Sequence, residues 1–95
     1  MEINSTREGA KLTLAPKGRV DTLTAPELEK AVTFDGVEEL VFDLAAVDYI
    51  SSAGLRVLLS AQKKMMGRSM VITGACPAVR EVFDITGFSD IFTFA

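Results

Sequence analysis

The stretch from Asp48 to Leu59 constrains the fold of this chain more than any other feature of the sequence. It follows an apolar run at residues 40–44 and reads Asp-Tyr-Ile-Ser-Ser-Ala-Gly-Leu-Arg-Val-Leu-Leu, which opens the longest amphipathic segment of the chain. A strand covered on both faces that leads into an amphipathic helix is typical of an α/β fold. The pattern places two hydroxyls, Ser51 and Ser52, where this helix begins.

Short strands and amphipathic helices alternate along the rest of the chain. Strands are expected at residues 3–7, 11–14 (with a resumption at 18–20), 39–45, 69–73 and 91–94. Helices are expected from Thr24 to Asp35, from Ser52 to Met66 and from Pro77 to Gly87. The order predicts one α/β domain, residues 1–95. Its mixed sheet of four to five strands begins with an antiparallel hairpin, continues as parallel βα units and is flanked by three helices.

Two local signals refine this prediction. Pro16 cannot donate to a sheet ladder, so the second strand is expected to bend or to lie at an edge there. Thr24 and Glu27 have the spacing of a capping box, which predicts that the Thr24 side chain caps the first helix.

Composition limits the classes of function. The chain has 95 residues, a net charge of −3, no histidine and a single cysteine, Cys76. Without histidine, most metal sites and most acid–base chemistry at neutral pH are excluded. The negative charge disfavours nucleic acid and anionic membranes as partners. No signal peptide or bilayer-spanning run is recognisable, and one cysteine fits a reducing compartment, so a cytoplasmic protein is expected.

Ser51 and Ser52 have two interpretations. Serine is a preferred helix cap in any protein, so one hydroxyl could simply cap the helix while the other fills a turn. Alternatively, one of them accepts a phosphate, because a helix start carries unpaired N–H groups and partial positive charge. Nucleophilic catalysis by serine is disfavoured, since no histidine can act as the base.

The neighbouring residues leave similar alternatives. Gly54 is either a tolerated poor helix former or a position where another backbone approaches closely. Asp21 and Asp43 are either a helix-start charge and a strand-end carboxylate or an acidic surround for the serine. Arg56 lies on a solvated face or faces a partner, and Cys76 is a small buried residue or a helix cap.

Several of these segments resemble one known family. Residues 43–55, Asp-Leu-Ala-Ala-Val-Asp-Tyr-Ile-Ser-Ser-Ala-Gly-Leu, resemble the signature of the bacterial anti-sigma factor antagonists, the STAS domain. Gly18-Arg19-Val20-Asp21 resembles the Gly-x-hydrophobic-Asp element of that family, and residues 77–88 resemble its third-helix segment.

The resemblance implies a regulatory protein that is not an enzyme and holds no cofactor or metal. It implies an anti-sigma factor that is also a serine kinase, which binds the unphosphorylated chain, phosphorylates Ser52 and releases a sigma factor when bound. A serine phosphatase would reset the switch. The implied partner-binding residues are Asp21, Ser51, Ser52, Ala53, Gly54, Leu55 and Arg56, with Asp43 framing the site.

Two departures from the family pattern add expectations. The family often has Asp immediately before the acceptor, where this chain has Ser51, so Ser51 is the alternative acceptor. The family commonly continues into a C-terminal helix beyond the position of Ala95, which could leave a face open for self-association. A small-ligand or nucleotide sensor and a constitutive scaffold in a sensory complex are the alternative functions.

Overall fold

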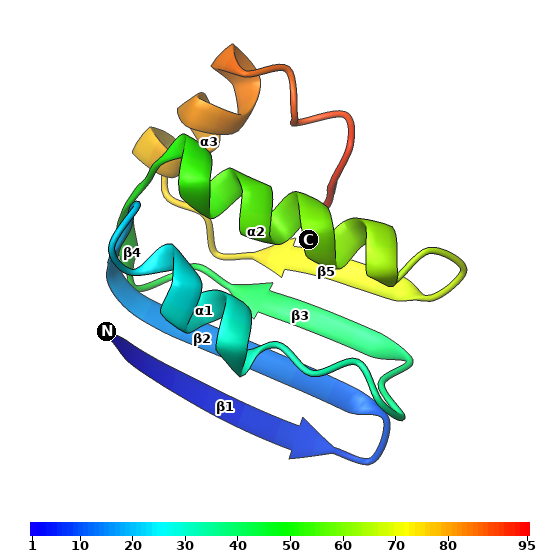
Figure 1. The fold of residues 1–95 in the computed structure, drawn as a ribbon. Helices are drawn as coiled ribbons and strands as arrows, with labels where there is room; N and C mark the ends of the chain where they lie inside the picture. Colours follow the sequence, from blue (N-terminus) through cyan, green and yellow to red (C-terminus); the bar gives the residue numbers. More distant parts are fainter.

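The computed structural model describes residues 1–95 and shows a mixed sheet with two helices, α1 and α2, side by side on one face (Figure 1). The helix α3 packs at the end of the sheet where α2 begins. The elements in chain order are β1 (Glu2–Glu8), β2 (Lys11–Val20), α1 (Ala25–Ala31), β3 (Glu39–Asp43), β4 (Val47–Ile50), α2 (Ser52–Lys64), β5 (Ser69–Thr73), α3 (Pro77–Ile85) and β6 (Thr93–Phe94).

The ten-residue strand β2 organises the sheet. On one side it pairs antiparallel with β1, which forms the predicted hairpin. On its other side β2 pairs in parallel first with β3 and then, from Gly18 onward, with β4. The sheet continues from β3 through β5 to β6, all parallel. The predicted fold class, a mixed sheet with three helices, is therefore confirmed.

The strand β4 was not predicted, so the sheet has six strands instead of four to five. Residues 47–50 escape recognition because only the first and last are buried, while Asp48 and Tyr49 are exposed. Pro16 lies between the stretches of β2 that pair with β3 and with β4, so its missing N–H disrupts neither pairing. The predicted edge position is wrong, because β2 lies inside the sheet between β1 and both β3 and β4, and Pro16 is in register with Ile3 of β1.

The core lies between the sheet and the two helices. The α2 residues Leu55, Leu58 and Ala61 are at most 2% exposed and pack into one cluster with the inward side chains of β2, β3 and β5. This helix was expected to run to Met66. It ends instead at Lys64, and Met66 lies in the following turn, where it is 82% exposed.

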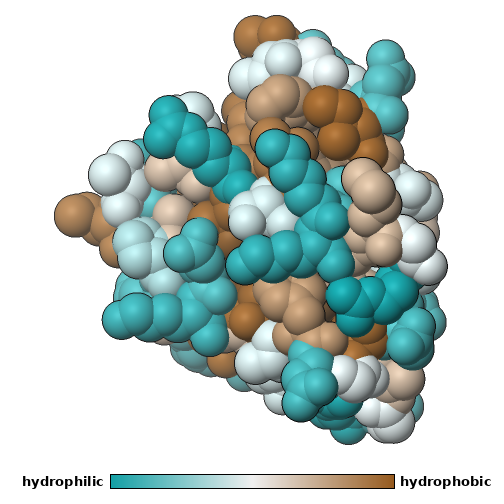
Figure 2. All heavy atoms as spheres, turned by 45° about the vertical axis from the view of Figure 1, so that its right-hand side comes forward, coloured by the Kyte–Doolittle hydropathy of each residue, from teal (hydrophilic) through white to brown (hydrophobic).

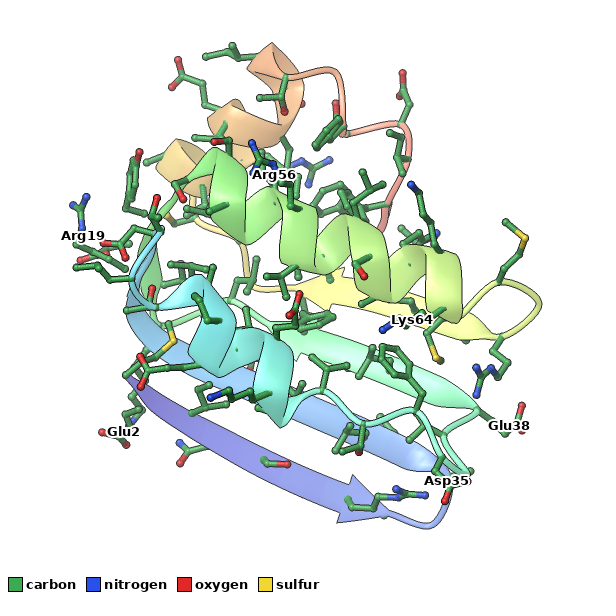
Figure 3. The ribbon with its side chains drawn as sticks, viewed as in Figure 1. Glu2, Arg19, Asp35, Glu38, Arg56 and Lys64 are labelled. Atoms are coloured by element: carbon green, nitrogen blue, oxygen red, sulfur yellow. The ribbon has the colours of Figure 1, made fainter.

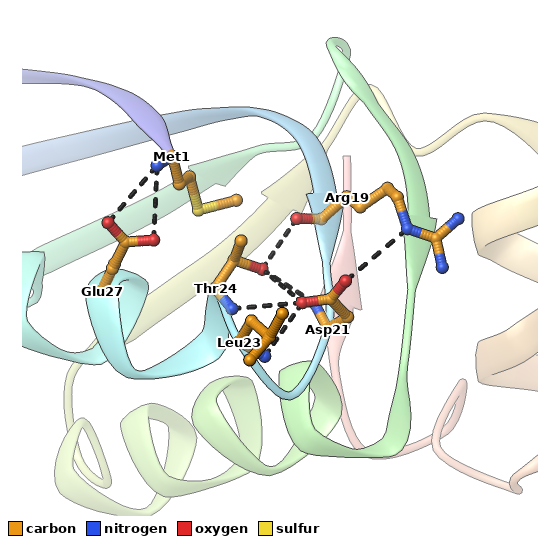
Figure 4. A network of polar contacts seen from close by, with 6 residues as sticks. All are labelled: Met1, Arg19, Asp21, Leu23, Thr24 and Glu27. Carbon is orange, nitrogen blue, oxygen red and sulfur yellow. Dashed lines mark hydrogen bonds and ion pairs between the residues drawn. The ribbon is translucent and has the colours of Figure 1, made fainter.

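The first helix is shorter than predicted and begins differently. It ends at Ala31, before the expected stop at Asp35. Thr24 precedes the helix but its side chain makes no cap hydrogen bond, so the predicted capping box is wrong. The Glu27 carboxylate instead lies 3.3 Å from the terminal amino group of Met1 (Figure 4). No helix of the protein is long and apolar enough to cross a bilayer.

Candidate functional site

The two serines occupy different positions at the start of α2. Ser51 is the N-cap, and its Oγ accepts a hydrogen bond from the backbone N–H of Gly54 at 3.4 Å. Its own backbone N–H donates to the Val20 carbonyl oxygen at 2.8 Å, which fastens the helix start to the end of β2. Ser51 is half-buried as a result. Ser52 is the first residue of the helix and is exposed, with no hydrogen bond from its hydroxyl.

This arrangement assigns one expected role to each serine. Capping consumes the Ser51 hydroxyl, because that oxygen satisfies a backbone donor that the helix itself leaves unpaired. The Ser52 hydroxyl has no structural task and faces solvent at the positive end of a 13-residue helix. An incoming enzyme can therefore reach Ser52 without opening the helix start.

Gly54 makes the tight junction beneath the serines possible. A Cβ at this position would lie 2.7 Å from the Cγ1 atoms of both Val20 and Ile50 and 3.2 Å from the Val20 carbonyl oxygen. Real side chains do not tolerate the first two distances, so the ends of β2 and β4 approach α2 only because Gly54 has no side chain. The close-approach interpretation of Gly54 is therefore confirmed.

The loop between β2 and α1 is held by Asp21 and Thr24 (Figure 4). The Asp21 Oδ1 atom accepts hydrogen bonds from the backbone N–H groups of Leu23 at 3.0 Å and Thr24 at 3.1 Å. The Thr24 Oγ1 atom accepts from the Asp21 N–H and donates to the Arg19 carbonyl oxygen, both at 2.8 Å. The Asp21 Oδ2 atom forms an ion pair with Arg19 Nε at 3.6 Å.

These contacts lower the pKa of Asp21 from its ordinary value. The largest cause is the hydrogen bond from the Thr24 backbone N–H, and the Leu23 N–H, the Thr24 hydroxyl and Arg19 act in the same direction against partial desolvation. Asp21 is thus ionised at neutral pH and directed into its own loop. This geometry matches the simpler interpretation of Asp21, a charge at a helix start.

Asp43 does not frame the serines. Asp43 ends β3, and the four residues of the unpredicted strand β4 lie between it and Ser51. Because a strand rises roughly 3.3 Å per residue, β4 carries the helix start well beyond Asp43. The Asp43 Oδ1 atom accepts from the Ala45 N–H at 3.0 Å within its own turn. Asp43 is therefore a strand-end carboxylate that does not join Asp21 in an acidic surround of the serines.

Two arginines, Arg19 and Arg56, lie at this end of the molecule. The Arg19 guanidinium lies 4.4 Å from the centre of the Tyr49 ring, next to its ion pair with Asp21. Figure 3 shows Arg19 projecting outward at the end of the sheet where α2 begins, with Arg56 farther along that helix. Arg56 is exposed one turn after Ser52, and it lines a recess of about 220 Å³. The other residues lining this recess are Thr22, Ala25, Pro26, Glu29, Ala53 and Val57.

Burial divides the predicted partner-binding set. Gly54 and Leu55 are buried, so they support the site from beneath and present no side chain to a partner in this conformation. Ser52 and Arg56 are exposed, and Ala53 is half-buried at the recess. Cys76 precedes α3 and its Sγ lies 3.7 Å from the Val47 carbonyl oxygen, which fits a local structural role.

Sequence reasoning missed Leu23, the most exposed large apolar side chain of the protein at 84%. The only available signal was a leucine between polar residues in a segment expected to form a turn. No cluster of three or more metal-ligating His, Cys, Asp or Glu side chains occurs.

Comparison with known proteins agrees with this fold. Residues 2–95 match the family model of the STAS domain. The chain belongs to the STAS domain family. Over 84 residues this STAS domain is 40% identical to BtrV of Bordetella bronchiseptica, a protein named as an anti-sigma factor antagonist, covering 83% of this chain and 72% of the relative.

Two further relatives extend the comparison. The anti-sigma-B factor antagonist of Listeria monocytogenes is 37% identical over 79 residues, covering 78% of this chain and 69% of the relative. The crystal structure of an anti-sigma factor antagonist from Mycobacterium paratuberculosis superposes with a TM-score of 0.88 at 28% identity, covering 98% of this chain and 83% of that one. The STAS fold and the anti-sigma factor antagonist resemblance inferred from the sequence are thus confirmed.

Proposed function

We propose that residues 1–95 act as one STAS domain that serves as an anti-sigma factor antagonist, controlled by reversible phosphorylation of Ser52. The observation that carries this proposal is the division of labour at the start of α2. Ser51 is occupied as the cap, and Ser52 presents a free, exposed hydroxyl beside it. The names of the relatives, which are anti-sigma factor antagonists, support the class of function.

The proposed partner is an anti-sigma factor with serine kinase activity. The unphosphorylated chain binds it at the surface around Ser52, and the sigma factor is released. A serine phosphatase reverses the modification. The STAS domain itself is a substrate and a ligand, not an enzyme, and nucleotide and metal belong to the kinase. This circuit places the protein in the bacterial cytoplasm, without direct contact to nucleic acid or membrane.

Electrostatics explains how the switch operates. A phosphate adds about −1.5 to −2 charges at neutral pH, which is large beside the net charge of −3 of the whole chain. The start of α2, and Arg56 one turn farther along the same helix, tolerate this charge, so the domain stays folded. A kinase surface that fits the neutral hydroxyl loses contact with the bulky dianion, so binding is lost without any change of fold.

The binding experiment compares three variants with the wild-type chain. Ser52→Ala and Ser51→Ala should keep binding to the purified cognate kinase, whereas Ser52→Asp should weaken it, because Asp introduces charge at the docking surface. Far-ultraviolet circular dichroism should show that all three variants are folded. Equal affinity of Ser52→Ala and Ser52→Asp for the kinase would contradict control of binding by phosphorylation of Ser52.

A small-ligand sensor is the second function that the sequence left open. The recess beside Ala53 and Arg56 has a volume of about 220 Å³. Pockets that bury small ligands are usually about 300–1,000 Å³. The small volume favours the phosphorylation switch over a ligand sensor. The remaining alternative is a scaffold that is never phosphorylated. Intact-mass measurement after incubation with the kinase and ATP distinguishes the two, because only the switch gains the mass of a phosphate.

A further inference from the structure

We infer that Leu23 is an apolar anchor through which the anti-sigma factor kinase recognises this protein, and that Asp21 acts by positioning Leu23 and not by touching the kinase. This inference rests on the proposed function and assigns the two residues of one loop to different tasks. It changes the role expected for Asp21, which the sequence placed among the partner-binding residues.

The exposure of Leu23 has no explanation within the folded chain. Its side chain is 84% exposed and contributes nothing to the core, whereas the neighbouring Ala25 and Leu28 are buried. Five large apolar side chains are exposed in all: Leu23, Tyr49, Met66, Ile85 and Ile91. On the face drawn in Figure 2, hydrophobic residues form several patches among hydrophilic ones, with adjoining hydrophobic residues near the top of the view. Each exposed side chain must therefore be judged by its position.

The loop that carries Leu23 lies beside the start of α2, where Ser52 is exposed. Asp21 follows Val20 directly, and the Val20 carbonyl oxygen accepts the N–H of Ser51 at 2.8 Å. The recess next to this junction joins both elements, because Thr22 and Ala25 line it together with Ala53 and Arg56. Met66, by contrast, follows the other end of α2, roughly 20 Å away at 1.5 Å per helical residue. A kinase that binds the surface around Ser52 therefore contacts Leu23 and not Met66.

Hydrogen bonds within the loop hold the segment that carries Leu23. The Leu23 N–H is fixed by Asp21 Oδ1, and Thr24 bridges Asp21 to the Arg19 carbonyl oxygen. A rigid loop loses little conformational entropy on binding, so most of the apolar burial of the leucine becomes affinity. The Asp21 carboxylate is already engaged with backbone N–H groups and with Arg19, which leaves it poorly placed to recognise a partner by charge.

The chemistry of the partner follows from the chemistry of the anchor. Near the groove that receives Ser52, the kinase should have an apolar depression that accepts a leucine side chain. Burying one leucine side chain corresponds to about 10- to 100-fold in affinity. Because this contact is apolar, the loss of affinity on removing it should not depend on salt concentration. The loss of affinity caused by phosphate at Ser52 should depend on salt, because it is electrostatic.

The first part of the test measures the affinity of unphosphorylated variants for the purified cognate kinase. Leu23→Ser should weaken binding about 10- to 100-fold, and Leu23→Met should restore most of the affinity. Met66→Ser is the matched control, because Met66 is equally exposed but remote, and it should bind like the wild type. Unchanged binding by Leu23→Ser, while the wild type binds and is phosphorylated, would overturn the anchor and leave the switch intact. A wild type that neither binds nor is phosphorylated would overturn both.

The second part tests how Asp21 acts. Asp21→Asn keeps an oxygen that accepts from Leu23 and Thr24, so it should retain most of the affinity. Asp21→Ala removes that oxygen and should weaken binding about as much as Leu23→Ser does. The double variant Asp21→Ala with Leu23→Ser should bind little worse than either single variant, because both changes remove the same contact. If Asp21→Asn weakens binding as much as Asp21→Ala, Asp21 contacts the kinase through its charge and the positioning role is wrong.

Discussion

At the scale of single residues, adjacent positions separate a hydroxyl that caps a helix from one that is exposed to solvent. Ser51 caps α2 and Ser52 faces solvent, although both have the same side chain. The sequence predicts a helix start at this pair but cannot assign the roles, because a shift of one residue in the start would exchange them. The deciding contact is the bond from Ser51 N–H to the Val20 carbonyl, which depends on the unpredicted pairing of β2 with β4.

A prediction at Gly54 tests whether this junction is as tight as the geometry indicates. Gly54→Ala should destabilise the protein by about 1–3 kcal/mol, since the new Cβ overlaps Val20 and Ile50. At an open helical site the same change would stabilise by about 1 kcal/mol. Urea unfolding measures the difference, with Ser52→Ala as a control on the same turn that should change stability little. A Gly54→Ala variant more stable than the wild type would contradict the packing described here.

A second prediction concerns the acid range. Because the pKa of Asp21 is lowered in the folded state, the ionised group stabilises the fold above its unfolded pKa of about 3.9. That contribution is lost as the pH falls through the lower folded pKa. The stability advantage of the wild type over Asp21→Asn should therefore be constant above about pH 5 and shrink below about pH 4. Urea unfolding across this range measures it, and an advantage that is unchanged in acid would show that the carboxylate is not held in its charged form.

At the scale of elements, side-chain hydrogen bonds join segments that strand pairing does not connect. Arg68 follows α2, and its guanidinium donates to the carbonyl oxygens of Phe34 at 3.1 Å, Val37 at 2.8 Å and Lys64 at 2.8 Å. It thereby joins the end of α2 to the segment between α1 and β3. Three carbonyls around one planar group suit an arginine, whose donors are fixed in a fork, better than a lysine.

Replacement of this arginine gives a prediction at the same scale. Arg68→Lys should destabilise the protein by about 1–3 kcal/mol, because one ammonium cannot satisfy carbonyls from two elements at once. Arg56→Lys is the matched control: Arg56 is exposed and makes no hydrogen bond, so the change should stay within about 0.5 kcal/mol. Equal midpoints of thermal unfolding for the two variants would show that Arg68 does not join these elements.

At the scale of the whole molecule, the sequence predicts the order of elements well and the placement of side chains around the site less well. The alternation of strand and helix patterns in the sequence predicts the hairpin, the parallel βα units and the core helix. The strand β4 is missed because Asp48 and Tyr49 are exposed. Without β4, the sequence places Asp43 too close to the serines. Leu23 is missed because hydropathy patterns report burial in elements and say nothing of an apolar side chain that a rigid loop holds in water.

Mapping of the phosphate after incubation with the purified cognate kinase and ATP tests directly whether Ser52 is the acceptor. Tandem mass spectrometry of the wild-type chain, Ser51→Ala and Ser52→Ala assigns the modified residue. We expect phosphate on Ser52 in the wild type and in Ser51→Ala, and none in Ser52→Ala. Phosphate on Ser51, or undiminished phosphorylation of Ser52→Ala, would contradict it.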